Sequence, residues 1–259
     1  MFIPFVAATS VTSFLLFWSR ARSRPLTRFY SSGLVGILED DGLKVKLLYH
    51  SEVETYYVSM NRCVKTIVII GDSFPARVLA DSSLTDDFGL DNEFTRVQWC
   101  VHGGMTLDKL HRQYRRELEL LAPFDGAILH IGSNDLCRDT VQSTMYKMVH
   151  TILPMLKSMQ CVNVFVCQVF HRRKGRMTGT LNLCHYNAKV DDFNSGLKNM
   201  LSPVQYWAHD SVLKCGQLKQ IWSADGVHFE HSKNKFMHKS LRGAVIHLTR
   251  WVFCLQTGV

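Results

Sequence analysis

The sequence lacks the short motifs that identify several common classes of enzyme. It contains no CxxC pair, and its Cys and His residues do not have the spacing of a zinc finger. It also contains no HExxH motif, no phosphate-binding P-loop and no GxGxxG turn. The sequence therefore gives no support to a zinc protease, a nucleotide hydrolase or a dinucleotide-dependent enzyme, and we expect no metal and no cofactor.

Acidic residues are absent from the first part of the chain. None occurs before Glu39, whereas an apolar run over residues 1–18 is followed by several arginines between 20 and 28. The run is short for a transmembrane helix, which needs about 20 apolar residues, and its positive charge follows the apolar part instead of preceding it. Arg-rich, Ser-rich and acid-poor segments are typical of mitochondrial presequences. We expect residues 1–32 to be a targeting, anchoring or disordered segment, with mitochondrial import and membrane association both left open.

A disulfide framework is not indicated either, although the chain of 259 residues has eight cysteines. Cys100, Cys161 and Cys167 fall in or beside apolar runs, where Cys behaves as a small buried hydrophobe. This usage is typical of a reducing compartment, so we expect an intracellular protein. Repeats and low-complexity tracts are also missing, and the apolar fraction of 46% excludes wholesale disorder.

Apolar runs of strand length alternate with helical patterns from residue 64 onward. The strand-like runs are 64–70, 96–101, 126–131, 162–170 and, more weakly, 204–208. The three-four spacing of helices is found in 107–121, 141–156, 186–201 and 232–252. Alternation of this kind implies a parallel sheet covered on both faces. We expect residues 63–255 to form an α/β, flavodoxin-like three-layer sandwich with strand order 2-1-3-4-5. Residues 33–62 would be a small extension, in which Asp40-Asp41-Gly42 indicates the turn of a hairpin.

Short polar motifs follow three of these strand-like runs, and a fourth precedes the last helix. Gly71-Asp72-Ser73 ends the first run, Gly103-Gly104 follows the second and Gly132-Ser133-Asn134-Asp135 follows the third. The fourth motif is Asp225-Gly226-Val227-His228. Ligands of open parallel sheets bind beyond the carboxyl ends of the strands, where the strand order reverses. We therefore expect these loops to converge on one cleft.

The side chains of these motifs are those that nucleophilic attack on an ester requires. A serine hydroxyl needs a base to remove its proton, and His228 is the candidate base for Ser73. Asp225, three residues earlier, is spaced to accept from one ring nitrogen while the other faces Ser73. Candidate donors to the oxyanion are the backbone N–H groups of Ser73 and Gly104 and the amide of Asn134. Each motif alone is weak, and the prediction depends on their joint occurrence in this order.

Together the motifs resemble the sequence blocks of the SGNH hydrolases, also called GDSL-type esterases and lipases. The first block resembles residues 70–73, with Phe74 where Leu is usual, and the second resembles residues 103–106, with Met105 at the Asp position. Residues 132–135 match the third block, and residues 225–228 match the fifth. The resemblance covers residues 64–250 and implies the same flavodoxin-like sandwich.

The resemblance implies a serine hydrolase of carboxylic, acyl or acetyl esters. Its catalytic residues would be Ser73 as nucleophile, His228 as base and Asp225 as the partner of the base. Its oxyanion donors would be Ser73, Gly104 and Asn134. Two further carboxylates of the motifs are expected to support this machinery: Asp72 and Asp135. Members of the family act on lipid, acetylated-sugar and thioester substrates, so the resemblance does not name the substrate.

A basic loop, residues 171–176, follows the fourth strand-like run at the edge where the cleft is expected. Arg172, Arg173 and Lys174 are candidates to bind an anionic part of a substrate, although an ordinary solvated loop also explains them. The alternative function is a binding module of the same fold that recognises nucleic acid or anionic lipid, and the net charge of +8 is compatible with it. No aromatic-rich platform for single strands accompanies the loop. The sequence therefore favours an esterase acting on a small-molecule, lipid or sugar ester.

Overall fold

The computed structural model of the chain describes residues 33–40, 43–50, 55–62, 64–90, 94–174, 182–202, 205–213 and 221–257. The expected targeting or anchoring segment, residues 1–32, lies outside the described residues. The chain divides into two compact units, residues 1–63 with 253–259 and residues 64–252. Within the described ranges, no helix combines the length and the apolar character needed to cross a membrane.

The first unit contains a three-stranded antiparallel sheet. Its strands, in the order β1-β2-β3, are β1 (Gly33–Asp40), β2 (Leu43–His50) and β3 (Thr55–Arg62). The predicted hairpin corresponds to the pairing of β1 with β2, and the structure adds β3, which pairs regularly with β2 from Leu43–Arg62 to His50–Thr55. Residues 55–62 are rich in aromatic and β-branched side chains, which favour strands. Three strands are also more stable than an isolated hairpin.

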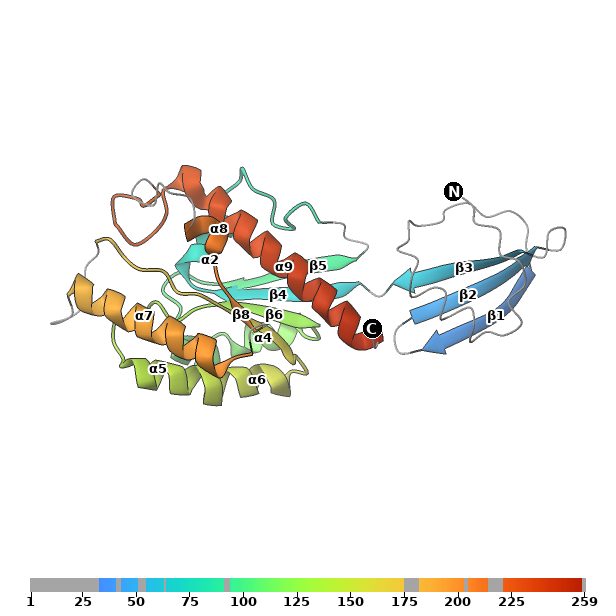
Figure 1. Ribbon diagram of the computed structural model, residues 1–259, viewed down its shortest axis with the longest axis horizontal. Helices are drawn as coiled ribbons and strands as arrows, with labels where there is room; N and C mark the ends of the chain where they lie inside the picture. The colour runs from blue at the N-terminus through green and yellow to red at the C-terminus, as the bar shows by residue number, and fades with distance from the viewer. Residues whose placement is uncertain are drawn as a thin grey trace. The chain divides into compact units, whose positions relative to one another are not determined.

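The second unit is built on a five-stranded parallel sheet (Figure 1). Its strands are β4 (Lys65–Gly71), β5 (Thr95–Val101), β6 (Gly126–His130), β7 (Asn163–Cys167) and β8 (Tyr206–Trp207). They lie in the order β5-β4-β6-β7-β8, which is the predicted 2-1-3-4-5, so the predicted fold class is confirmed. β7 ends earlier than the predicted run 162–170. The apolar run continues past the end of the strand because Val169 and Phe170 are buried in the loop that follows it.

Helices cover both faces of this sheet. One face carries α2 (Ser73–Leu79), α8 (Asp210–Leu213) and, after the short helix η3 (His231–Lys233), α9 (Asn234–Thr257). The other face carries α3 (Leu107–Arg112), α4 (Arg115–Leu121), α5 (Val141–Lys147), η1 (Met148–Ile152), α6 (Leu153–Ser158) and α7 (Leu183–Met200). Figure 1 shows α9 and α7 on opposite sides of the strands. The predicted single helix 107–121 is two helices, since Tyr114 (φ −104°, ψ 1°) departs from helical geometry.

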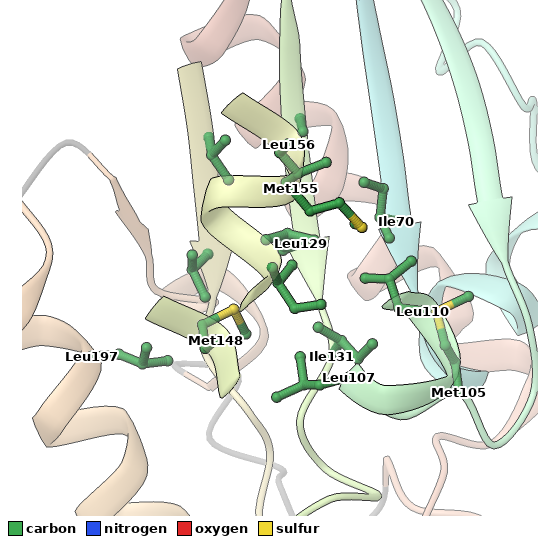
Figure 2. Close-up of a cluster of buried hydrophobic side chains, with 14 of the residues drawn as sticks. Ile70, Met105, Leu107, Leu110, Leu129, Ile131, Met148, Met155, Leu156 and Leu197 are labelled. Carbon is green, nitrogen blue, oxygen red and sulfur yellow. The ribbon is translucent and has the colours of Figure 1, made fainter. Parts of the chain in front are cut away.

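Alternate side chains of the strands feed two separate cores. Val68 and Ile70 of β4 enter a core rich in Leu and Met, which we call the aliphatic core. Figure 2 shows Ile70 and Leu129 directed toward Met148 and Met155 within it. Ile67 and Ile69 enter the opposite core, called the aromatic core, which contains Phe74, Phe88, Phe165, Phe170 and Phe229. The carboxyl ends of β4, β5 and β6, and hence the loops that follow them, lie side by side above these cores.

Candidate functional site

Ser73 is the first residue of α2, directly after the central strand β4. The side chain of Asp72 caps this helix by accepting from the N–H of Phe74 at 3.2 Å. The N–H of Asp72 in turn donates to the carbonyl of His130 at the end of β6, at 3.1 Å. A Cβ on Gly71 would lie 2.8 Å from that same carbonyl, so only glycine fits here. The nucleophile candidate is therefore fixed to two adjacent strands.

The structure brings Ser73, His228 and Asp225 together in one hydrogen-bonded chain. His228 Nε2 lies 2.7 Å from Ser73 Oγ, across 155 residues of sequence. His228 Nδ1 lies 2.7 Å from Asp225 Oδ2. This is the arrangement in which a carboxylate fixes the ring tautomer and leaves the second nitrogen to take a proton from the hydroxyl.

Asp225 and His228 belong to one tight turn. Asp225 Oδ1 accepts from the backbone N–H groups of Val227 and His228, at 2.8 and 2.9 Å, and from the hydroxyl of Ser223 at 2.6 Å. A bridge between Trp222 and Phe229 closes the turn from both sides. The turn is thus held by hydrogen bonds among residues that are close together in the sequence.

The same hydrogen bonds set the charge of Asp225. Burial raises the pKa of this carboxyl, but hydrogen bonds from His228, Ser223 and Val227 outweigh it and lower the pKa overall. Arg77 Nη2 lies 3.5 Å from Asp225 Oδ2. Asp225 is consequently ionised at neutral pH, as stabilisation of an imidazolium requires.

Gly104 and Asn134 lie on the two neighbouring loops, after β5 and β6. Gly104 has a left-handed φ of +69°, which favours glycine, and no heavy atom lies within 4 Å of the position of a Cβ. Asn134 Nδ2 donates to the carbonyl of Met105 at 3.0 Å. The loop after β5 is tied to β4 as well, because the N–H of His102 donates to the carbonyl of Gly71 at 3.0 Å.

Asp135 links the same two loops, those after β5 and β6. Both of its carboxylate oxygens accept from the N–H of Leu107, the first residue of α3, at 3.0 and 3.3 Å. The side chain is almost fully buried, and this burial raises its pKa to about 7 against the opposing effect of the Leu107 hydrogen bond. Asp72 and Asp135 are thus both buried, and each accepts a hydrogen bond from the backbone at the start of a helix, α2 for Asp72 and α3 for Asp135.

The basic loop differs from the expectation at Arg172. The sequence offered this residue as a candidate to bind an anionic part of the substrate, or else as part of a solvated loop, but the residue is only 8% exposed. Its guanidinium lies over the ring of Tyr186, 4.6 Å from the centroid, and donates to Ser133 Oγ at 3.2 Å. The apolar run that includes Phe170 carries the chain inward here, so Arg172 supports the loop that bears Asn134.

Arg173 and Lys174 are exposed, and their backbone lies against the turn of Asp225 and His228. The N–H groups of both residues donate to the carbonyl of Gly226, at 2.7 and 3.2 Å. Gly226 has φ +63°, and a Cβ there would collide with Lys174. These contacts place the two cations beside the candidate site, and their role in substrate binding stays a prediction.

Several residues that position the site escaped the sequence reasoning. The ring of Phe74 lies 5.6 Å from that of His228 and 5.1 Å from that of Phe229, centroid to centroid. Ser223 supports Asp225, and Tyr186 contacts Ser133 at 3.1 Å. Only Ser223 carried a usable signal, since it precedes Asp225 and Gly226 and all three residue types are typical of turns.

Among the residues that the structure describes, no group of possible metal ligands includes Asp225 or His228. Within the described residues, the one group of three His, Cys, Asp or Glu side chains with suitable spacing is Cys100, His102 and Glu117. This group shares no residue with the hydrogen-bonded set of Ser73, His228 and Asp225.

No protein-family model and no curated protein matches this sequence. Solved structures do share its fold. A candidate acylhydrolase of Bacteroides fragilis superposes with a TM-score of 0.56 at 17% identity, over 71% of this chain and 88% of that one. A GDSL-like lipase of Bacteroides thetaiotaomicron gives 0.53 at 14% identity, over 70% and 88%. A candidate SGNH hydrolase of Slackia heliotrinireducens gives 0.52 at 12% identity, over 70% and 99%.

Proposed function

We propose that this protein, whose second unit has the fold of the SGNH hydrolases, is a serine esterase that hydrolyses carboxylic esters. The observation that carries the proposal is the unbroken chain from Ser73 Oγ through His228 to Asp225, with both contacts at 2.7 Å. A fold alone does not determine a function, but side chains in catalytic geometry argue for one.

In the proposed reaction, His228 Nε2 takes the proton of Ser73 as Oγ attacks the carbonyl carbon of the ester. The imidazolium is stabilised by ionised Asp225. When the tetrahedral intermediate collapses, His228 returns the proton to the departing alcohol. Water then repeats the attack on the acyl-serine, with His228 again as base, and releases the acid and free Ser73.

The oxyanion of the intermediate would be held by three donors. These are the backbone N–H groups of Ser73 and Gly104 and the amide of Asn134. An amide nitrogen has two hydrogens to donate, and Asn134 uses one on Met105. The second hydrogen is therefore available to the substrate while the first fixes the side chain.

The alternative, a binding module that uses the basic loop, receives less support. It depended on Arg172, Arg173 and Lys174 as a cationic surface, and Arg172 is buried against Tyr186. An arginine in that position serves the loop of Asn134, which is part of the proposed catalytic machinery.

The test is covalent labelling with a fluorophosphonate, together with hydrolysis of a short p-nitrophenyl ester. We expect the label on Ser73, and we expect Ser73→Ala to lose the label and to lower kcat by a factor of about 10⁴ or more. The control is Ser232→Ala, an exposed serine outside the site. Equal turnover by Ser73→Ala and the native chain would reject the proposal. Salt-dependent binding of nucleic acid or acidic vesicles without labelling would support the binding module instead.

A further inference from the structure

Cys100, His102 and Glu117 bring three metal-ligand side chains together outside the proposed catalytic site. Cys100 is near the end of β5, His102 follows that strand directly and Glu117 lies in the first turn of α4. One ligand atom from each side chain lies within 4.8 Å of the other two. The closest pair is His102 Nε2 and Glu117 Oε2, at 2.8 Å.

These separations are close to those of a tetrahedral zinc site. Bonds of about 2.0–2.3 Å to nitrogen, oxygen and sulfur imply ligand atoms about 3.3–3.8 Å apart. His102 and Glu117 are closer than that range, at 2.8 Å, and none of the three ligand atoms lies more than 4.8 Å from another. Cys100 is fully buried on its strand, whereas the side chains of His102 and Glu117 are 35% and 40% exposed. The more exposed side chain, Glu117, has room to adjust, and water can reach the position of a fourth ligand.

The chemistry of the three groups also favours zinc. A thiolate and a carboxylate together carry the two negative charges that balance a divalent ion, and a Cys and His pair is too soft for Mg²⁺ or Ca²⁺. The imidazole of His102 is already oriented, because it stacks on the ring of Tyr114 with centroids 4.0 Å apart and planes 5° apart. Little conformational freedom remains to be lost on binding.

We propose that Cys100, His102 and Glu117 bind a zinc ion, with a water molecule as the fourth ligand. His102 immediately precedes Gly103 and Gly104, so the ion would fasten the loop of the oxyanion donor Gly104 to α4. Zinc binding at this site does not require the proposed esterase activity, because none of the three ligands takes part in it. It has no zinc-finger spacing because its third ligand comes from a separate helix.

The experiment is titration of Co²⁺ into the metal-free full-length chain, followed by absorbance, with Zn²⁺ as competitor. We expect one Co²⁺ per chain, a thiolate-to-cobalt charge-transfer band, tetrahedral d–d bands, and loss of all of them on addition of Zn²⁺. Cys100→Ser should abolish the charge-transfer band. His102→Gln and Glu117→Gln should each raise the Kd for zinc by about tenfold or more. Loss of a ligand should cost at least as much affinity as loss of a residue that only hydrogen-bonds to a ligand.

Two matched variants serve as controls. Glu119→Gln removes a carboxylate from the same helix, where it pairs with Arg115, and Cys161→Ser removes another buried thiol. Both should bind Co²⁺ like the native chain. A charge-transfer band that survives Cys100→Ser, a Kd equally weakened by Glu119→Gln, or no saturable binding at all would overturn the proposal. Because Cys100 is buried, the two Gln variants, at partly exposed positions, decide the test if Cys100→Ser does not fold.

Discussion

The half of the candidate site that contains Ser73 and His228 is packed among aromatic rings in addition to its own hydrogen bonds, whereas the half that contains Gly104 and Asn134 is supported by hydrogen bonds to the backbone. Phe74 alone contacts the rings of His130, Phe170, Trp222, His228 and Phe229. On the other side, Asn134 and Asp135 bind the carbonyl of Met105 and the N–H of Leu107. The aliphatic core below that side consists mainly of Leu, Ile, Val and Met.

The difference follows from the task proposed for each half. A ring that accepts and returns a proton must keep its orientation while its charge changes, and packing against flat, nonionisable rings provides this. Oxyanion donors must keep a fixed backbone, and hydrogen bonds between two loops provide that. Variants that damage one half should therefore differ in kind from variants that damage the other.

Among variants that compare the two halves, the largest effect is expected for Asn134→Ala, which removes a donor from the hydrogen-bonded half. We expect kcat to fall by about 10²–10³, with little change in KM, because the contact forms in the transition state. The control is Asn163→Ala, whose amide also donates to a backbone carbonyl, that of Asp125 at 3.0 Å, at the opposite end of the sheet. Equal losses of activity in both variants would contradict the assigned role.

Asp135→Asn should change the pH dependence of stability. The pKa of Asp135 is about 7 in the folded chain and 3.8 for an ordinary Asp, so the folded state binds more protons between these values. The contribution of Asp135 to stability therefore falls as pH rises through this interval, by about 2 kcal/mol between about pH 5 and pH 7. Asn keeps an acceptor for Leu107 but cannot ionise, so this slope should disappear.

Urea unfolding at several pH values measures the slope. Asp87→Asn, at a partly exposed carboxyl, should leave it unchanged. If Asp135→Asn kept the full native slope, ionisation of Asp135 would not couple to the packing of the two loops.

Gly226→Ala tests the turn in the aromatic half. We expect a loss of about 1–2 kcal/mol of unfolding free energy from the left-handed φ, with further strain from the collision with Lys174 and a lower kcat as the turn of His228 shifts. Gly89→Ala is the matched control, because Gly89 has φ +60° and no atom within 4 Å of a Cβ. It should reproduce the cost of the backbone conformation alone and leave kcat unchanged. A kcat loss of the same size in both variants would show that contact with the basic loop is irrelevant.

The smallest effect is expected for Phe74→Leu, compared with Met105→Leu in the other half. The first substitution removes ring contacts, including the one to His228, and should cost about 1 kcal/mol beyond the change in buried area. The second nearly conserves volume in an aliphatic environment and should cost less. Thermal unfolding and kcat measure both. A larger cost for Met105→Leu would reverse the comparison.

The strand order and the convergence of the loops could be predicted from the sequence, because parallel strands direct their carboxyl ends to one edge. The contact between Ser73 and His228 was predicted from the spacing of Asp225 and His228 and from the resemblance of the motifs to the SGNH hydrolase blocks. Burial of Arg172 was not predictable, since its partners Tyr186 and Ser133 come from other elements and nothing beside Arg172 indicates them. The group of Cys100, His102 and Glu117 escaped likewise, because it depends on the break at Tyr114 that sets the course of α4.

The turn from Ser223 to His228 gathers the carboxylate, the imidazole and their hydrogen bonds into six consecutive residues. Such a unit keeps its own geometry when other parts of the molecule shift. The fold therefore has to fix only one long-range distance, that from the turn to the start of α2. Substitutions elsewhere in the second unit should therefore disturb the contact between Asp225 and His228 less than the contact between His228 and Ser73.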